Sequence, residues 1–231
     1  MVDWRAIRLV AFDVDGTLYA QKPLRTRMMV ALAAHTLRRQ SLRDLSVLRS
    51  YRELREEVGS AEVEDFDNVL LAQVAQRHGL DMQGVRAIVA EWMEERPLQH
   101  LSACRYPLVD QLFDRIRQSG RSLGILSDYP TSAKVQALGL HADYLVSASD
   151  VGLLKPHPRG LERLMELAGT TPEQTILIGD RADRDAAAAQ RAGCACLLRS
   201  AKPIPGALTF ARFDDPVFDG LSQPVRTTEP A

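Results

Sequence analysis

Charged and hydroxyl side chains stand where several short apolar runs of this sequence end. In chain order they are Asp13, Asp15, Ser127, Asp128, Lys155, Asp180, Asp183 and Asp185. Clustered aspartates with a lysine suit phosphoryl transfer, because a phosphate dianion repels a carboxylate nucleophile unless a divalent cation and a positive side chain offset the charge. The residue types therefore predict a metal-assisted site for phosphoryl chemistry.

The individual residue types suggest which side chains would bind the metal and which would bind the phosphate. Asp13, Asp180 and Asp185 offer the oxygen ligands that Mg²⁺ prefers. Lys155 would neutralise phosphate oxygens, and Ser127 would donate a hydrogen bond to them. Backbone amides after the first aspartate can form an anion-binding nest, beside a glycine that lets the backbone approach closely. The predicted phosphate-binding residues are Gly16, Thr17, Ser127, Asp128 and Lys155. Asp128 is explained equally well as a turn residue, because Asp is common at strand-to-helix turns.

An alternating α/β fold would bring these residues together. Strand-like apolar runs occupy 7–12, 122–126, 144–147, 175–178 and 194–198, and helical patterns separate them from residue 106 onward. The pattern also allows one more strand near 208–213, and residues 171–174 have capping-box form. We predict a Rossmann-like, mostly parallel sheet with helices on both faces, whose ligands bind at the carboxyl ends of the strands.

A helical block interrupts this pattern after the first strand. Between about residues 26 and 95 we expect four helices, the first over 28–39. Apolar stripes at helical spacing comprise Val47, Tyr51, Leu54 and Val58, then Val63, Phe66, Leu70 and Val74, then Val85, Ile88, Val89 and Trp92. We predict a Rossmann-like catalytic core at 1–18 and 101–213, a helical cap at 19–100 and a C-terminal tail at 214–231, with its last five residues loose.

The composition is that of an ordinary soluble globular protein. The 231 residues include 29 Lys or Arg and 30 Asp or Glu, a formal net charge of −1. No basic surplus suggests a nucleic acid or membrane partner. The first residues lack signal-peptide features and no segment is long enough to span a bilayer, so we expect a cytoplasmic location. The three cysteines are a poor disulfide framework.

Four segments, in this order, resemble the signature motifs of the haloacid-dehalogenase-like (HAD) superfamily. They are Asp13-Val14-Asp15-Gly16-Thr17, Ser127, Lys155-Pro156, and Gly179-Asp180 with Asp185. The resemblance covers residues 7 to about 200. The order of the motifs is similar to that of the phosphoglycolate-phosphatase-like subgroup, whose helical cap lies between the first and second motifs.

The resemblance implies a Mg²⁺-dependent phosphatase that acts on a small phosphorylated metabolite. Asp13 would attack phosphorus to form an aspartyl-phosphate, with Ser127 and Lys155 as further catalytic residues. Asp15 would protonate the leaving alcohol and then activate water, and its main-chain carbonyl would contact the metal. Because Asp15 must first hold a proton, we expect its pKa to be raised in the substrate complex. The dehalogenase branch of the superfamily lacks this second acid and needs no metal.

Several alternatives stay open. A phosphomutase would use the same motifs, and a non-catalytic phospho-ligand-binding protein would keep the fold, although a pure binder has no need of an acid at Asp15. Asp185 stands where the later aspartate of the family usually falls, but the sequence leaves open whether Asp185 or Asp183 supports the metal. We interpret Lys22, Arg25 and Arg27 as solvated surface, with contact to an anionic substrate as the alternative. A monomer or homodimer is expected, since no long exposed apolar stripe is evident.

Overall fold

The structure is a computed structural model that describes residues 2–225. Six parallel strands form one sheet in the order β3-β2-β1-β4-β5-β6. The strands are β1 Leu9–Phe12, β2 Ser122–Ser127, β3 Tyr144–Ser147, β4 Thr175–Gly179, β5 Ala195–Arg199 and β6 Thr209–Phe210. The predicted α/β fold with a parallel sheet is therefore confirmed, and the sixth strand occupies two residues of the expected segment.

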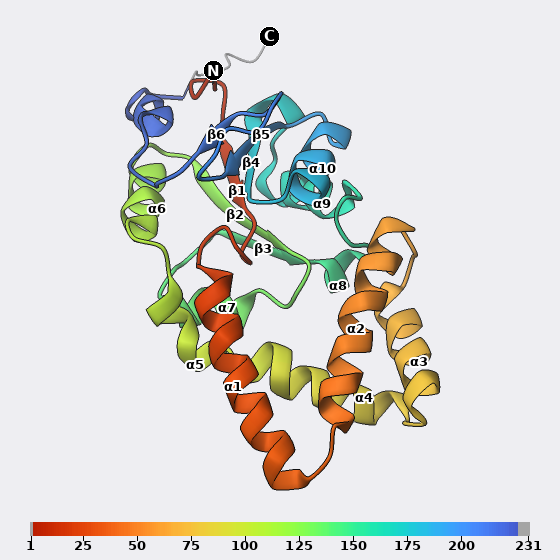
Figure 1. The fold of residues 1–231 in the computed structure, drawn as a ribbon. Helices are drawn as coiled ribbons and strands as arrows, with labels where there is room; N and C mark the ends of the chain where they lie inside the picture. Colours follow the sequence, from red (N-terminus) through yellow and green to blue (C-terminus); the bar gives the residue numbers. More distant parts are fainter. Residues whose placement is uncertain (1, 226–231) are drawn as a thin grey trace.

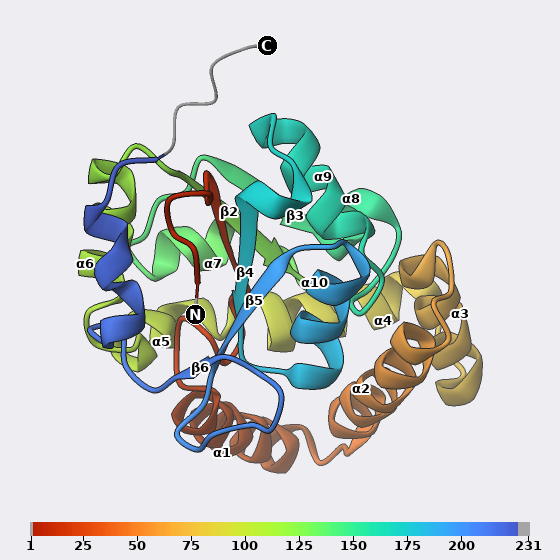
Figure 2. The same ribbon diagram turned by 90° about the horizontal axis from the view of Figure 1, so that it is seen from above.

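Helices cover both faces of this sheet, and the central strand is buried on both sides. Leu9 and Ala11 of β1 join one apolar cluster, while Val10 and Phe12 join the other, as the alternation of side chains along a strand requires. Figure 2 shows α6 and α9 on opposite sides of the strands. The helices of this part are α6 Val109–Gln118, α7 Ser132–Ala137, α8 Ala148–Val151, α9 Arg159–Ala168, η3 Pro172–Gln174, η4 Ala182–Ala186, α10 Ala187–Arg191 and η5 Pro216–Ser222.

Two terminal segments of the chain pack together at one side of the sheet. The 3-10 helix η5 lies within the predicted tail, and its buried Phe218 has its ring centroid 6.0 Å from that of Trp4. The predicted looseness of the last five residues lies outside the described residues. The predicted capping box is confirmed at Thr171 and Gln174, where η3 leads into β4.

The helical insert lies between β1 and β2, and its first two helices extend away from the sheet (Figure 1). Its helices are α1 Gln21–Arg39, α2 Arg43–Ser60, α3 Phe66–His78, α4 Met82–Val89, the π-helix η1 Ala90–Glu95, α5 Leu98–Leu101 and the 3-10 turn η2 Ser102–Cys104. Most of the predicted stripe residues on α2, α3 and α4 pack into one apolar cluster, which includes Tyr51, Leu70 and Val85, whereas Val58 and Phe66 join a second cluster. The four expected helices are therefore present.

Helix α1 differs from its prediction in where it begins. It begins at Gln21 rather than at residue 28, because Pro23 is tolerated in a first helical turn and Leu24 is its one buried residue, so no stripe marks its start. We expected no long exposed apolar stripe, and several separate apolar side chains are exposed in this part of the chain. Large apolar side chains exposed on α1 and the start of α2 are Met29, Val30, Leu37, Leu42 and Leu45.

Among the described helices, none is long and apolar enough to cross a membrane. The cysteines are all free thiols.

Candidate active site

The predicted charged residues gather in one pocket at the carboxyl edge of the sheet. The strands reach this edge together, because Phe12 pairs in register with Ile125 of β2 and Ile178 of β4. The pocket lining includes Asp13, Asp15, Asp128, Lys155, Asp180 and Asp185. Residues that follow parallel strands thus meet at the place where α/β proteins bind their ligands.

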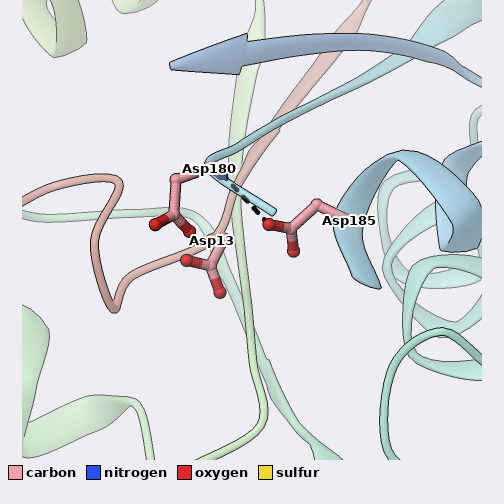
Figure 3. Close-up of side chains that lie close together, drawn as sticks. All are labelled: Asp13, Asp180 and Asp185. Carbon is pink, nitrogen blue, oxygen red and sulfur yellow. Dashed lines mark hydrogen bonds between the residues drawn. The ribbon is translucent and has the colours of Figure 1, made fainter. Parts of the chain in front are cut away.

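Three carboxylates form a group with the composition of a divalent-cation site. One oxygen from each of Asp13, Asp180 and Asp185 lies within 4.8 Å of the others, and Figure 3 shows the three side chains together. Oδ1 of Asp180 is buried and has no hydrogen-bond partner. Burial and the neighbouring Asp185 raise the pKa of Asp180 to about 6. A buried carboxylate oxygen without a donor costs free energy, and the all-oxygen donor set fits Mg²⁺.

A buried lysine links two of these carboxylates. Nζ of Lys155 lies 2.5 Å from Asp13 Oδ1 and 2.6 Å from Asp185 Oδ1, and Thr17 Oγ1 donates to the other oxygen of Asp13 at 3.1 Å. Burial together with neighbouring carboxylates raises the pKa of Asp13 well above its usual value, although Lys155 opposes this. Burial alone would lower the pKa of Lys155, but Asp13 and Asp185 outweigh it and raise that pKa. The lysine is therefore held as a cation beside Asp13.

Asp185, rather than Asp183, lies in the carboxylate group. Oδ2 of Asp185 accepts the backbone N–H groups of Asp180 and Arg181 at 3.1 and 3.0 Å. Asp183 is exposed and pairs with Arg181 at 2.8 Å. The helical segment between β4 and β5 begins with the π-helix η4, and this wider turn keeps both Asp185 and the neighbouring Arg184 buried.

Two glycines allow the carboxylates to approach the backbone. Gly16 has a φ of +101°, which an L side chain rarely adopts, and an added Cβ would collide with the carboxylate of Asp180. At the end of β4, a Cβ on Gly179 would collide with the side chain of Asp185. The glycines of the first and fourth motifs are therefore required by close packing around the carboxylates.

Asp15 has a cation of its own, which the sequence did not reveal. The buried Lys134 on α7 donates to both carboxylate oxygens of Asp15 at 2.7 Å, and the hydroxyl of Tyr19 donates to one of them. Burial would raise the pKa of Asp15, but Lys134 and Tyr19 outweigh it, so this pKa is lowered. The raised pKa expected in the substrate complex stays a prediction. The spacing of four residues between Asp15 and Tyr19 is a signal that could have indicated their contact.

The second motif supports both the acid and the lysine. Ser127 Oγ donates to Asp15 Oδ2 at 3.3 Å, which places its hydroxyl directly behind an aspartate that lines the pocket. Asp128 Oδ1 accepts the backbone N–H of Lys155 at 3.0 Å. Because an ionised carboxylate only accepts hydrogen bonds, the side chain of Asp128 positions the lysine loop.

The insert contributes a buried arginine that the sequence analysis did not identify. Arg55 on α2 lines the pocket and donates to the Tyr51 hydroxyl at 3.1 Å and to the carbonyl oxygen of Asp128. Its Cζ lies 4.2 Å from the ring centroid of Tyr129. Arg25, which we interpreted as solvated surface, is exposed and also lines this pocket. The insert therefore places positive charge on one wall of the site.

Contacts between the insert and the sheet edge lie next to the carboxylate group. Glu56 of α2 pairs with Arg184 at 2.7 Å and with Arg181 at 3.1 Å. Arg181 immediately precedes η4, and Arg184 lies within it. A small apolar cluster joins the same two regions and consists of Val58, Phe66, Ala148 and Leu154. The position of α2 is therefore tied to the loop that carries Asp180 and Asp185.

The fold and this arrangement of motifs agree with a comparison of the chain with known families. The family model for haloacid dehalogenase-like hydrolases matches residues 7–193. The chain belongs to this family of hydrolases. The matched region runs from the strand before Asp13 to the helix after Asp185, so it contains all the charged residues that meet in the pocket.

The chain is also similar to individual members of the family and to solved structures over most of its length. A glyceraldehyde 3-phosphate phosphatase from Methanopyrus kandleri is 29% identical over 204 residues, which are 81% of each chain. A phosphoglycolate phosphatase from Yersinia pseudotuberculosis is 28% identical over 210 residues, 85% of this chain and 82% of that protein. The crystal structure of a 2-haloacid dehalogenase from Pseudomonas syringae pv. Tomato DC3000 is also similar, with a TM-score of 0.67 and 20% sequence identity. The superposition covers 94% of this chain and 99% of the dehalogenase chain. That likeness shows the shared fold.

Proposed function

We propose that this enzyme is a Mg²⁺-dependent phosphatase that hydrolyses a small phosphomonoester through an aspartyl-phosphate on Asp13. The observation that carries the proposal is the meeting of two differently held aspartates at one sheet edge. Asp13 lies beside Lys155 and the other two carboxylates, whereas Asp15 is held by Lys134. A dehalogenase would have no use for this second acid. The similarity to proteins named as phosphatases supports the same reaction.

The two aspartates divide the chemistry into two balanced steps. A carboxylate oxygen of Asp13 attacks phosphorus, the bond to the leaving alcohol breaks, and the alcohol oxygen takes a proton from Asp15. Water then attacks the phosphorus of the aspartyl-phosphate and gives its proton to Asp15, which releases inorganic phosphate and restores Asp13. The negative charge of an entering phosphate would oppose Lys134 and favour the protonated form of Asp15.

The remaining groups would bind the metal and the phosphate and would offset the negative charge of the phosphate. Asp13, Asp180 and Asp185, with the main-chain carbonyl of Asp15, would hold Mg²⁺, which would offset negative charge at the transferring phosphate. Lys155 would add a second positive charge, and Ser127 would donate a hydrogen bond. Gly16 and Thr17 would supply backbone N–H groups near the phosphate.

The helical insert would act as a cap over this site. Arg25 of α1 and Arg55 of α2 already line the pocket together with Asp13. Closure of these helices over the substrate would exclude water during the first step, and reopening would release the products. The residues proposed as a boundary between core and cap are 18 and 101, close to the start of α1 and the end of α5.

The proposal is tested by phosphate release from a panel of small phosphomonoesters, with and without Mg²⁺. We expect turnover that stops when EDTA removes the metal and is lost in Asp13→Asn, by about 10⁴-fold or more for removal of a covalent nucleophile. A phosphomutase would instead give a rearranged phosphate ester without free phosphate. Turnover that survived Asp13→Asn would contradict the assignment of the nucleophile.

A further inference from the structure

Asp15 is surrounded by donors on both of its carboxylate oxygens. Lys134 donates to Oδ1 and Oδ2 at 2.7 Å each, the Tyr19 hydroxyl donates to Oδ1, and the Ser127 hydroxyl donates to Oδ2 at 3.3 Å. An ionised carboxylate has about four acceptor positions, so these contacts use all of them. Asp15 can therefore reach a leaving alcohol only where one of these donors gives up its position.

Ser127 is the donor that can give up its position. Its bond to Asp15 is the longest of these contacts, and under the proposed function its hydroxyl donates to the phosphate. Because a hydroxyl carries a single proton, Ser127 cannot donate to a phosphate and to Asp15 at once. When Ser127 turns to the phosphate, one acceptor position of Oδ2 becomes free on the side of that phosphate.

The other two donors contact Asp15 without being part of the pocket wall. Lys134 is 6% exposed and Tyr19 is 3% exposed, and within residues 2–225 neither side chain is among those that line the pocket. Nζ of Lys134 also lies 4.6 Å from the ring centroid of Tyr129, in the loop that follows β2. Both donors would therefore act on a bound substrate only through Asp15.

The backbone of Tyr19 is fixed where the two connections between the core and the insert meet. Tyr19 forms a β-bridge with Arg105. Beside this bridge, the N–H of Ala20 donates to the carbonyl oxygen of Cys104 at 2.9 Å. The Tyr19 hydroxyl thus contacts Asp15 from a paired segment rather than from a free loop.

Lys134 differs from Lys155, the other buried lysine near the sheet edge. Lys155 lines the pocket and pairs with Asp13 and Asp185, whereas the ion pair of Lys134 is with Asp15. A buried ion pair is weak evidence for stability, since its desolvation can cost more than the attraction returns. Two short bonds from one ammonium group do fix the direction of a carboxylate, and orientation is what a catalytic acid requires.

We propose that Lys134 and Tyr19 are positioning residues that aim Oδ2 of Asp15 at the leaving-group oxygen of the substrate. This inference rests on the proposed phosphatase function and adds to it the groups that orient its acid. The two residues hold Oδ1 in place while Ser127 turns to the phosphate. The alcohol oxygen then takes its proton from Oδ2 as its bond to phosphorus breaks, and water later returns a proton to the same oxygen.

The test compares substrates that differ in their need for an acid. An alkyl phosphate must have its leaving oxygen protonated, whereas p-nitrophenyl phosphate releases a stable phenolate. The alkyl substrate is glyceraldehyde 3-phosphate or 2-phosphoglycolate, whichever the wild type hydrolyses faster. The measured quantity is kcat/KM, which for a covalent mechanism reports the steps up to phosphorylation of Asp13.

Lys134→Met should lower kcat/KM by about 10²-fold for the alkyl phosphate and by less than about threefold for p-nitrophenyl phosphate, since general acid catalysis contributes about 10²- to 10⁴-fold. Tyr19→Phe removes one hydrogen bond and should lower the value for the alkyl phosphate by about tenfold. Lys134→Arg keeps a cation with several donors, so it should recover part of the loss.

Two variants provide matched controls that should leave both kcat/KM values unchanged. Gln136→Met changes an exposed residue on the same helix as Lys134. Tyr106→Phe removes the hydroxyl of a tyrosine whose ring packs 6.4 Å from that of Phe213, outside the pocket lining. Equal losses for both substrates in Lys134→Met and Tyr19→Phe would indicate a structural role and would overturn the proposal.

Asp15→Asn separates this proposal from the proposed function. It removes the acid itself, so it should lower kcat/KM for the alkyl phosphate more than for p-nitrophenyl phosphate, and adding Lys134→Met should cause no further loss for the alkyl phosphate. If Asp15→Asn lowered both values equally, the acid assigned in the proposed function would be wrong. If Asp15→Asn distinguished the substrates but Lys134→Met and Tyr19→Phe did not, only the positioning role would be overturned.

Discussion

Two regions line the same pocket, and the buried cations that they contribute have different partners. At the sheet edge, Lys155 is 4% exposed and lies between the carboxylates of Asp13 and Asp185. On the insert, Arg55 is 8% exposed and has only neutral partners. The sheet edge thus balances its charges within the protein, as fixed catalytic groups require. The insert holds a buried arginine for which no ion pair is found among residues 2–225.

This difference separates the expected effects of mutations in the two regions. Changes at Lys155 and the three clustered carboxylates should reduce turnover of every phosphomonoester alike. Changes at the wall formed by α2 should alter the choice among substrates, because α2 contributes Arg55 to the pocket. Glu56 connects the regions through Arg181 and Arg184, so its substitution tests how firmly the two are joined.

The largest effect is expected when the cation of the sheet edge is removed. Lys155→Met should lower kcat for every substrate by about 10²- to 10³-fold, because a preorganised positive charge at the phosphate is lost. It should also lower the free energy of unfolding by about 3 kcal/mol, since Asp13 and Asp185 would lose their buried partner. Steady-state kinetics and urea denaturation measure the two effects.

A double variant provides the control for this change. Lys155→Met combined with Asp185→Asn removes one of the two unpaired carboxylates, so it should regain stability without regaining activity. If Lys155→Met reduced turnover of only one substrate class, the contrast between the sheet edge and the insert would break down.

A smaller effect is expected at the carboxylate group, where two nearby aspartates form a matched pair. Asp180→Asn should raise the Mg²⁺ concentration that gives half-maximal activity by about tenfold or more, because a charged oxygen ligand is lost. Asp183→Asn should leave this concentration unchanged, since Asp183 is exposed and pairs with Arg181. Activity measured across a Mg²⁺ titration distinguishes them. A larger shift for Asp183→Asn than for Asp180→Asn would show that the metal ligand has been misassigned.

The smallest effect is expected at the junction of the two regions. Glu56→Gln should lower the free energy of unfolding by about 1 kcal/mol or less, because the pair is partly exposed and screened by salt. Glu53→Gln, which breaks an exposed pair within α2, should cost about 0.3 kcal/mol. Urea denaturation at low and high salt measures both. Equal costs for the two variants would mean that the contact of Glu56 with the core adds nothing to stability.

Sequence patterns were sufficient for the strands and for the residues that end them. Short apolar runs located β1 to β5, and the motif residues at their carboxyl ends met as expected because all these strands are parallel. Periodicity was less informative for α1, where a proline in the first turn and a single buried residue left no stripe. It also could not distinguish the π-helix η4 from an α-helix, although that turn buries Asp185 and leaves Asp183 exposed.

The sequence by itself determined the fold class, the order of the elements and the carboxylates at the sheet edge, because these depend on local residue patterns and on strand direction. Only the tertiary structure decided which cations face which groups. Lys134 reaches Asp15 across 119 residues of sequence, and Arg55 reaches Asp128 across 73. Local spacing carries no information about such contacts, because the fold of the core brings α7 to Asp15, and packing of the insert against the sheet edge brings Arg55 to Asp128.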